Sequence, residues 1–201
     1  TKSSCPMVDA PFYYARIGRE FSECDRWRSA LLAQIAKIKP DVVVFGSTYT
    51  SAFTPNQWTE GTTRILDALA PASGHVYIMR STPVLPFDGP SCLEPRSWLY
   101  RMLSPRAACT AAAHSNRSDS VYRSLEAAAG RFANVSMIDM TDAICPDGTC
   151  SAQRDGTIVF RDSQHLTANY ARTLAAALQT RMTASGPAPP PKFPTIRARV
   201  S

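Results

Sequence analysis

The chain has 201 residues, of which 44% are hydrophobic and 19% are charged. This length fits one domain with a tail better than two full domains, and the composition excludes a disordered chain, a collagen and a coiled coil. No segment approaches the roughly 18 consecutive apolar residues that cross a bilayer. The first ten residues also lack the basic start and apolar run of a signal peptide.

The net charge of +6 is concentrated toward the C-terminus. Five of the 22 basic residues and none of the 16 acidic residues follow Asp162, which leaves residues 1–162 almost neutral. Nucleic-acid binding requires clustered basic side chains interleaved with stacking aromatic residues, so we expect no nucleic-acid partner. Residues 186–201 are rich in proline and are expected to form a disordered basic tail behind a domain that spans residues 1–185.

Six cysteines fall along the chain as three local couples. An even number of cysteines with this spacing indicates disulfides, although sequence alone allows 15 connectivities. Zinc binding is the alternative, but no Cys-x-x-Cys motif is present and we expect no metal. Disulfides imply an oxidising, extracytoplasmic location. Pairing of neighbours would give the bridges Cys5–Cys24, Cys92–Cys109 and Cys145–Cys150.

The first part of the chain predicts two helices that alternate with two strands. Apolar residues recur at helical spacing in residues 22–39, and Pro40 ends that helix. Residues 41–45 (DVVVF) are a β-branched run typical of a strand buried on both faces of a parallel sheet. A second helix is expected between residues 55 and 70 and a second strand at residues 75–80, with His75 on the surface at its start.

The second part of the chain begins with an irregular stretch. Residues 81–115 contain five prolines and two cysteines, which favours an ordered, disulfide-tied excursion. His114 in this stretch is expected to lie in solvent. The following elements are a helix marked by Val121, Leu125 and Ala128 and capped by Asn116 or Ser118, a strand at 134–139, a short strand at 157–160, and a last helix capped by Thr167.

This alternation predicts a three-layer α/β/α sandwich with a mostly parallel sheet. Ligand chemistry in such folds lies beyond the carboxyl ends of the strands. Two loops therefore become candidates for a functional site, namely residues 46–50 (GSTYT) and residues 162–165 (DSQH).

Asp162 and His165 are the strongest catalytic candidates. Their spacing of three residues lets the carboxylate accept a hydrogen bond from imidazole Nδ1, which leaves Nε2 free to act as a general base toward a hydroxyl. The alternative is a structural pair in which Asp162 caps the last helix.

The segment FRDSQHLTANYARTLAAAL at residues 160–178 resembles the closing segment of SGNH hydrolase-like domains that are attached to integral-membrane acyltransferases of bacteria. Further similarity lies in SSCP at 3–6, KPDVVVF at 39–45, VYIMRSTPVLP at 76–86 and MIDMTDAICPDGTC at 137–150. The resemblance implies a Ser–His–Asp site that transfers short acyl groups, usually acetyl, to or from a cell-surface polysaccharide or glycolipid. It also implies an acyl donor and a membrane acyltransferase domain in the same full-length chain.

The family's nucleophile belongs to a Gly-Asp-Ser motif after the first strand, and this motif is absent from the sequence. We expect that the first strand and its serine precede Thr1, together with a membrane tether, and the alternative is that this member has lost the motif. The resemblance places oxyanion donors at Gly46, Ser47 and Thr48, although a simple turn is equally consistent with these residues, and Ser47 could replace the nucleophile. Trp98 is the candidate for a substrate rim.

Three functions remain open from the sequence. The first is serine-dependent acyl transfer or ester hydrolysis on an extracytoplasmic glycan, which needs no metal or organic cofactor. The second is a non-catalytic module that binds a glycan or a partner of the membrane acyltransferase, and the absence of Gly-Asp-Ser favours it. The third is a stand-alone secreted esterase.

Overall fold

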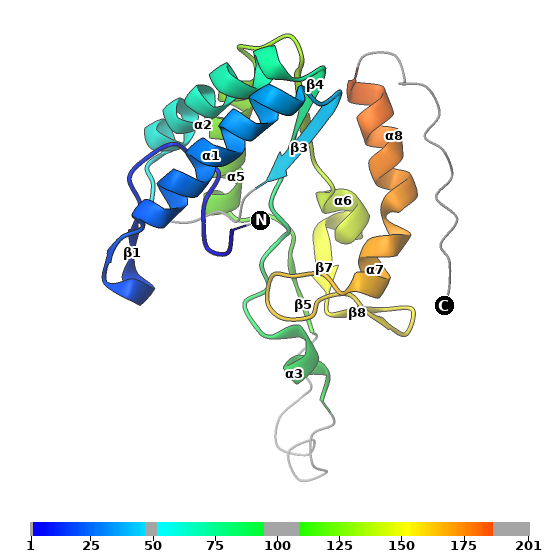
Figure 1. Cartoon of the computed structure of the whole chain (residues 1–201). Coiled ribbons are helices and arrows are strands. Elements are labelled where there is room, and N and C mark those ends of the chain that lie inside the picture. The colour runs from blue at the N-terminus through cyan, green and yellow to red at the C-terminus, as the bar shows by residue number, and fades with distance from the viewer. Residues whose placement is uncertain (1, 47–51, 95–108, 187–201) are drawn as a thin grey trace, which may run out of the picture.

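The computed structural model describes residues 2–46, 52–94 and 109–186. A parallel three-stranded sheet runs through the middle with the strand order β3-β4-β6, and helices cover both of its faces (Figure 1). The predicted α/β sandwich with a parallel sheet is therefore confirmed. The sheet strands are β3 (Val42–Gly46), β4 (His75–Met79) and β6 (Val135–Ile138).

The central strand β4 supplies both hydrophobic cores of the molecule. Its alternate side chains Val76 and Ile78 belong to one buried cluster, whereas Tyr77 belongs to the other, because successive side chains of a strand point to opposite faces. A strand that is buried on both faces is expected to be a continuous apolar run, and β4 is buried in this way. The same prediction for residues 41–45 was wrong, because Val44 in β3 is 45% exposed.

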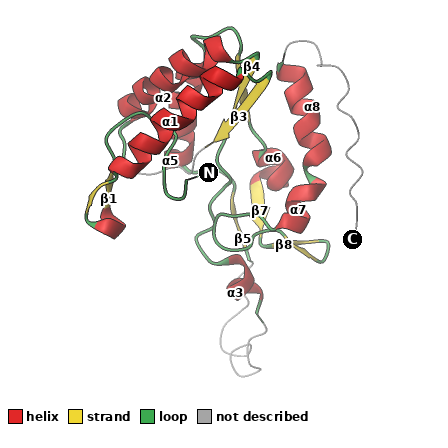
Figure 2. Cartoon of the chain, viewed as in Figure 1, coloured by secondary structure: helices red, strands yellow, loops and turns green. Residues whose placement is uncertain are grey.

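Two groups of helices cover the sheet. Figure 2 shows α1, α2 and α5 packed together on one side of the sheet and α6, α7 and α8 on the other. Thr54 and Gln57 form a reciprocal capping box at the start of α2, and Ser115 and Ser118 do the same for α5. The longer helices are α1 (Ser22–Ile38), α2 (Pro55–Leu69), α5 (Asn116–Ala129), α7 (Ala168–Thr173) and α8 (Ala175–Ser185).

Short elements connect these layers. In the described ranges, three small antiparallel pairs lie outside the main sheet: β1 with β2, β5 with β7 and β8 with β9. The short elements are β1 (Tyr13–Tyr14), η1 (Ala15–Ile17), β2 (Arg19–Glu20), η2 (Ala70–Ala72), α3 (Gly89–Leu93), β5 (Thr110–Ala112), α6 (Thr141–Ile144), η3 (Pro146–Gly148), β7 (Thr149–Ser151), β8 (Gln153–Arg154) and β9 (Thr157–Ile158).

Some expectations need correction. Ser115, rather than Asn116 or Ser118, is the N-cap of α5. The last helix is divided at Leu174 into α7 and α8, although Thr167 caps its start as predicted.

His75 is not on the surface, since it is 4% exposed and its Nε2 lies at hydrogen-bonding distance, 3.0 Å, from Ser136 Oγ. The end of α8 covers this part of the sheet, and the resulting burial lowers the pKa of His75.

The three disulfides join the neighbouring couples expected from the spacing of the cysteines, namely Cys5–Cys24, Cys92–Cys109 and Cys145–Cys150. Within the described ranges, no helix is long and apolar enough to cross a bilayer. Residues 187–201 of the expected tail lie outside the described residues, so the domain boundary near residue 185 stays a prediction.

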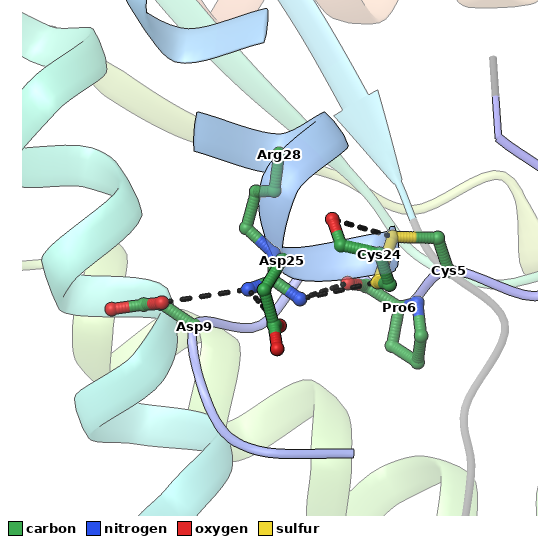
Figure 3. Close-up of a disulfide and its surroundings, with 6 residues drawn as sticks. All are labelled: Cys5, Pro6, Asp9, Cys24, Asp25 and Arg28. Atoms are coloured by element: carbon green, nitrogen blue, oxygen red, sulfur yellow. Dashed lines mark hydrogen bonds and ion pairs between the residues drawn. A yellow bond between two sulfur atoms is a disulfide. The ribbon is translucent and has the colours of Figure 1, made fainter. Parts of the chain in front are cut away.

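The N-terminal segment is fixed to α1 by a disulfide and a buried arginine. Figure 3 shows the Arg28 guanidinium beside the Cys5–Cys24 bridge. The Arg28 side chain is only 3% exposed, and its Nη1 lies 3.1 Å from Asp25 and 3.4 Å from Asp9. Its Nη2 donates to the Pro6 carbonyl at 3.5 Å. The segment before α1 pairs only β1 with β2 and joins no strand of the main sheet, so these contacts help to hold it against α1.

We expect Arg28→Ala to lower the free energy of unfolding by about 2 kcal/mol, since the Pro6 carbonyl loses a donor and Asp25 loses its cation, whereas Asp9 keeps its ion pair with Arg64. Urea unfolding measures the change. The matched control is Arg26→Ala in the exposed face of the same helix, which should change stability by no more than about 0.5 kcal/mol. Equal losses in the two variants would contradict the anchoring role of Arg28.

Candidate active site

The Asp162–His165 turn is closed by backbone hydrogen bonds on both sides. Arg161 N–H donates to the His165 carbonyl at 2.7 Å, and Thr167 N–H donates to the Val159 carbonyl at 2.9 Å. Val159 and Phe160, which lead into the turn, are fully buried. The chain therefore enters the turn from the core and leaves it into α7, so the polar residues between are held at a fixed place on the surface.

The segment after β4 supports the same turn. Leu85, itself 2% exposed, donates its N–H to the Ser163 carbonyl at 2.7 Å. Gly89, at the start of α3, packs so closely that an added Cβ would lie 3.0 Å from the Phe160 carbonyl oxygen. The carboxyl end of β4 is therefore linked to the Asp162–His165 turn by one short stretch of chain, and ligands of α/β folds generally bind beyond this end of the strands.

Within this turn the structure brings the two candidate catalytic side chains together. His165 Nδ1 lies 2.7 Å from Asp162 Oδ2. The other carboxylate oxygen, Oδ1, accepts the backbone N–H groups of Gln164 and His165, each at 2.8 Å. Because an ionised carboxylate only accepts, Nδ1 must carry the proton in this hydrogen bond, and the neutral imidazole presents an unprotonated Nε2.

The environment keeps Asp162 ionised. Partial burial works in the opposite direction, but hydrogen bonds from the two backbone N–H groups and from the imidazole lower the pKa of Asp162 to about 2, from an ordinary value of 3.8. A carboxyl with a lowered pKa contributes stability that is present above its ordinary value and is lost as the pH falls through about 2. Asp162 is therefore a permanent anion next to His165 at neutral pH.

The geometry supports general acid and base chemistry. The His165 side chain is 55% exposed and that of Asp162 is 35% exposed, so a substrate hydroxyl can reach the ring while the carboxylate stays partly covered. An imidazole whose Nδ1 is held by a carboxylate can take a proton at Nε2, and the adjacent negative charge stabilises the imidazolium that forms.

A second His–Asp pair was missed by sequence reasoning. His114 Nδ1 lies 3.1 Å from Asp119 Oδ1, and Arg80 Nη2 lies 3.3 Å from the same nitrogen. Arg80 also pairs with Asp119 and, at 3.1 Å, with Asp139. The charge of Asp119 is thus engaged by an arginine, and His114 Nδ1 faces a donor and an acceptor at once. This arrangement does not fix the imidazole tautomer, in contrast to that of His165.

The positions of Arg80 and Asp139 in the sequence could have predicted part of this second cluster. Arg80 directly follows β4 and Asp139 directly follows β6, so parallel pairing brings them to the same edge of the sheet. The other oxygen of Asp139, Oδ1, accepts the Thr141 N–H at the start of α6 at 2.8 Å.

The remaining site candidates are only partly described. Gly46 is the last residue of β3 and pairs with Met79, so it reaches the carboxyl edge of the sheet. Ser47, Thr48 and Trp98 lie outside the described residues. Their expected roles in the oxyanion hole and the substrate rim stay predictions. In the part of the chain that the structure describes, no cluster of three His, Cys, Asp or Glu residues could hold a metal ion.

Comparison with known families identifies the domain. Residues 1–180 match the family described as the SGNH domain fused to AT3 domains. The chain belongs to this SGNH family. Among solved structures, the periplasmic domain of the lipopolysaccharide acetyltransferase of Salmonella ser. Paratyphi A aligns with a TM-score of 0.62 and 12% sequence identity. The alignment covers 88% of this chain and 67% of that one, and at this identity it shows a shared fold. No curated protein matches the chain.

The region that matches the SGNH family includes the Asp162–His165 turn, where the structure brings the two candidate catalytic side chains together. The match also covers β3, β4 and β6, which form the sheet at whose carboxyl edge the turn lies. The SGNH domain thus provides an ordered Asp–His pair at the edge where α/β proteins carry their chemistry.

We predict that the carboxyl group of Asp162 titrates with a midpoint near 2 when its side-chain carbon is followed by NMR. His165→Ala should raise this midpoint, since one hydrogen bond to the carboxylate is lost. The midpoint should still lie below the ordinary value, because the two backbone donors remain.

Arg172→Gln is the control for this titration, because Arg172 is exposed and its guanidinium binds Asn169 on α7. It should leave the midpoint unchanged. An ordinary midpoint for Asp162 in the unaltered chain would contradict the hydrogen-bond pattern of the turn.

Proposed function

We propose that this SGNH domain carries out serine-dependent O-acyl transfer, most simply acetyl transfer, or ester hydrolysis on an extracytoplasmic polysaccharide or glycolipid. His165 acts as the general acid and base, and Asp162 orients it. The observation that carries this proposal is the 2.7 Å contact between His165 Nδ1 and an Asp162 carboxylate that two backbone donors hold in place.

The proposed reaction runs in two steps. His165 Nε2 removes the proton of a serine hydroxyl as its oxygen attacks the acyl carbonyl, and the tetrahedral oxyanion collapses when the donor oxygen leaves with the proton from His165. The acyl-serine is then attacked by an acceptor hydroxyl, or by water, that gives its proton to His165. The serine oxygen leaves with this proton, which regenerates the serine and the neutral His165, and no metal or organic cofactor is needed.

The nucleophilic serine is proposed to come from chain upstream of Thr1. The sequence has no Gly-Asp-Ser motif. Among the described strands, β3 pairs only with β4, and Val44 in its middle is 45% exposed. An unpaired edge on an apolar strand next to the candidate site supports a further strand at this position, because unpaired edges of this kind are usually covered. A serine at the end of such a strand would lie beside Gly46.

Oxyanion stabilisation is proposed to come from the loop that begins at Gly46. Backbone N–H groups of Gly46 and Ser47 would point at the developing negative charge, and the Ser47 or Thr48 hydroxyl would add a donor. What supports this role is that β3 delivers Gly46 to the carboxyl edge of the sheet. Trp98 is proposed to form part of the rim that contacts the sugar.

The location and partners follow from the same reasoning. Three disulfides support an oxidising compartment outside the cytoplasm. The family's description supports an AT3 membrane acyltransferase domain in the same full-length chain, which would tether the SGNH domain and supply the acyl group. A cell-envelope glycan or glycolipid is the proposed acceptor, and the structural neighbour is itself a periplasmic domain of a lipopolysaccharide acetyltransferase.

A non-catalytic module is the second candidate function. The specific observation in its favour is the absence of Gly-Asp-Ser from the 201 residues. In that case the domain would bind a glycan or a partner of the membrane acyltransferase and transfer no acyl group.

The test is hydrolysis of a chromogenic acetyl ester by the full-length protein. We expect His165→Ala to lower kcat at least about a thousandfold, because the serine loses its base. Asp162→Asn should cost about a hundredfold or more, because the amide no longer fixes the Nδ1–H tautomer.

His114→Ala is the matched control, since His114 also contacts an aspartate but is placed outside the mechanism. It should retain full activity. An unchanged rate for His165→Ala would contradict the catalytic assignment, and a full-length protein without ester hydrolysis or acyl transfer would favour the binding module.

A further inference from the structure

Arg161 places a positive charge beside the Asp162–His165 pair. Its side chain is 70% exposed, and its Nε lies 3.9 Å from Asp162 Oδ2, the same oxygen that accepts the His165 hydrogen bond. Guanidinium and imidazole therefore lie next to one carboxylate oxygen. This distance is too long for a hydrogen bond, so Asp162 attracts the guanidinium without occupying its donors.

The hydrogen-bonding positions of Asp162 are already taken. Oδ1 accepts two backbone N–H groups and Oδ2 accepts the imidazole N–H. Among the described residues, the Arg161 guanidinium has no hydrogen-bond acceptor, and its five donors are available to a ligand. In contrast, the exposed Arg172 already donates to Asn169 Oδ1 at 2.9 Å.

The backbone of Arg161 is nevertheless fixed. Its N–H donates to the His165 carbonyl at 2.7 Å, and the preceding residue, Phe160, is fully buried. The guanidinium therefore extends from a rigid point beside the general base. A planar guanidinium recognises carboxylate and phosphate groups with two parallel hydrogen bonds, which a neutral sugar cannot match.

We propose that Arg161 binds an anionic group, a carboxylate or a phosphate, on the saccharide that reacts at His165. Arg161 is thus a specificity-determining residue that selects acidic glycans over neutral ones. This inference rests on the proposed function, because it takes the Asp162–His165 pair as the reaction centre, but its test reads binding and needs no turnover.

The experiment is an NMR titration of the His165 imidazole signals at low ionic strength. Three probes are used: methyl glucuronide for a carboxylate, glucose 1-phosphate for a phosphate and methyl glucoside as the neutral sugar. We expect at least one anionic sugar to shift the His165 signals and to bind about tenfold more tightly than the neutral one. The tighter of the two anionic sugars identifies the group that the site prefers. Added salt should weaken this binding, since exposed charges are screened.

Arg161→Gln should weaken binding of that anionic sugar about tenfold, as expected for the loss of a charge-assisted pair. Arg172→Gln, which removes another exposed positive charge from α7, should leave the affinity unchanged. The inference is overturned by equal affinities for the charged and neutral sugars, by the absence of binding, or by equal losses in the two variants.

The two proposals fail in different ways. If His165→Ala retains ester hydrolysis in the full-length protein while sugar binding still depends on Arg161, the proposed catalytic function is wrong and the anion site stands. If His165→Ala is inactive and Arg161→Gln binds the anionic sugars as well as the unaltered chain does, the catalytic proposal stands and the role of Arg161 is wrong.

Discussion

The carboxylate of Asp162 is the group on which the candidate site depends. Backbone N–H groups of Gln164 and His165 occupy one of its oxygens and the His165 imidazole occupies the other. Because these donors favour the ionised form, the aspartate stays charged and its oxygens stay in place. A fixed anion determines both the orientation of the imidazole and its tautomer, and the proposed general base requires both properties.

The fold places this carboxylate where it can act. β3, β4 and β6 run parallel, so their carboxyl ends, including Gly46, meet at one edge of the sheet. Fully buried Val159 and Phe160 lead into the Asp162–His165 turn, and Leu85 holds it from the β4 side. In the N-terminal segment, Arg28 and the Cys5–Cys24 disulfide fix the chain to α1.

Much of this arrangement could be predicted from the sequence, because it is encoded locally. The β-branched run at 41–45, the helical spacing in 22–39 and the capping residue Thr167 each determine one element through short-range contacts. Burial of His75 could not be predicted, since it depends on the distant end of α8. The Arg80–Asp139 pair was missed for a similar reason, because strand register brings those residues together. Asp162 and His165 could be paired because their positions are only three apart, whereas coordinates were needed to show that the Arg161 guanidinium has no acceptor among the described residues.

The central claim is that Asp162 holds the proton of neutral His165 on Nδ1 and leaves Nε2 free. Nitrogen-15 chemical shifts of the imidazole distinguish the two tautomers when they are recorded at a pH at which the ring is neutral and carries one N–H. The account predicts protonated Nδ1 in the unaltered chain and a loss of this preference in Asp162→Asn, where the amide can also donate. A ring protonated on Nε2 in the unaltered chain would contradict the account.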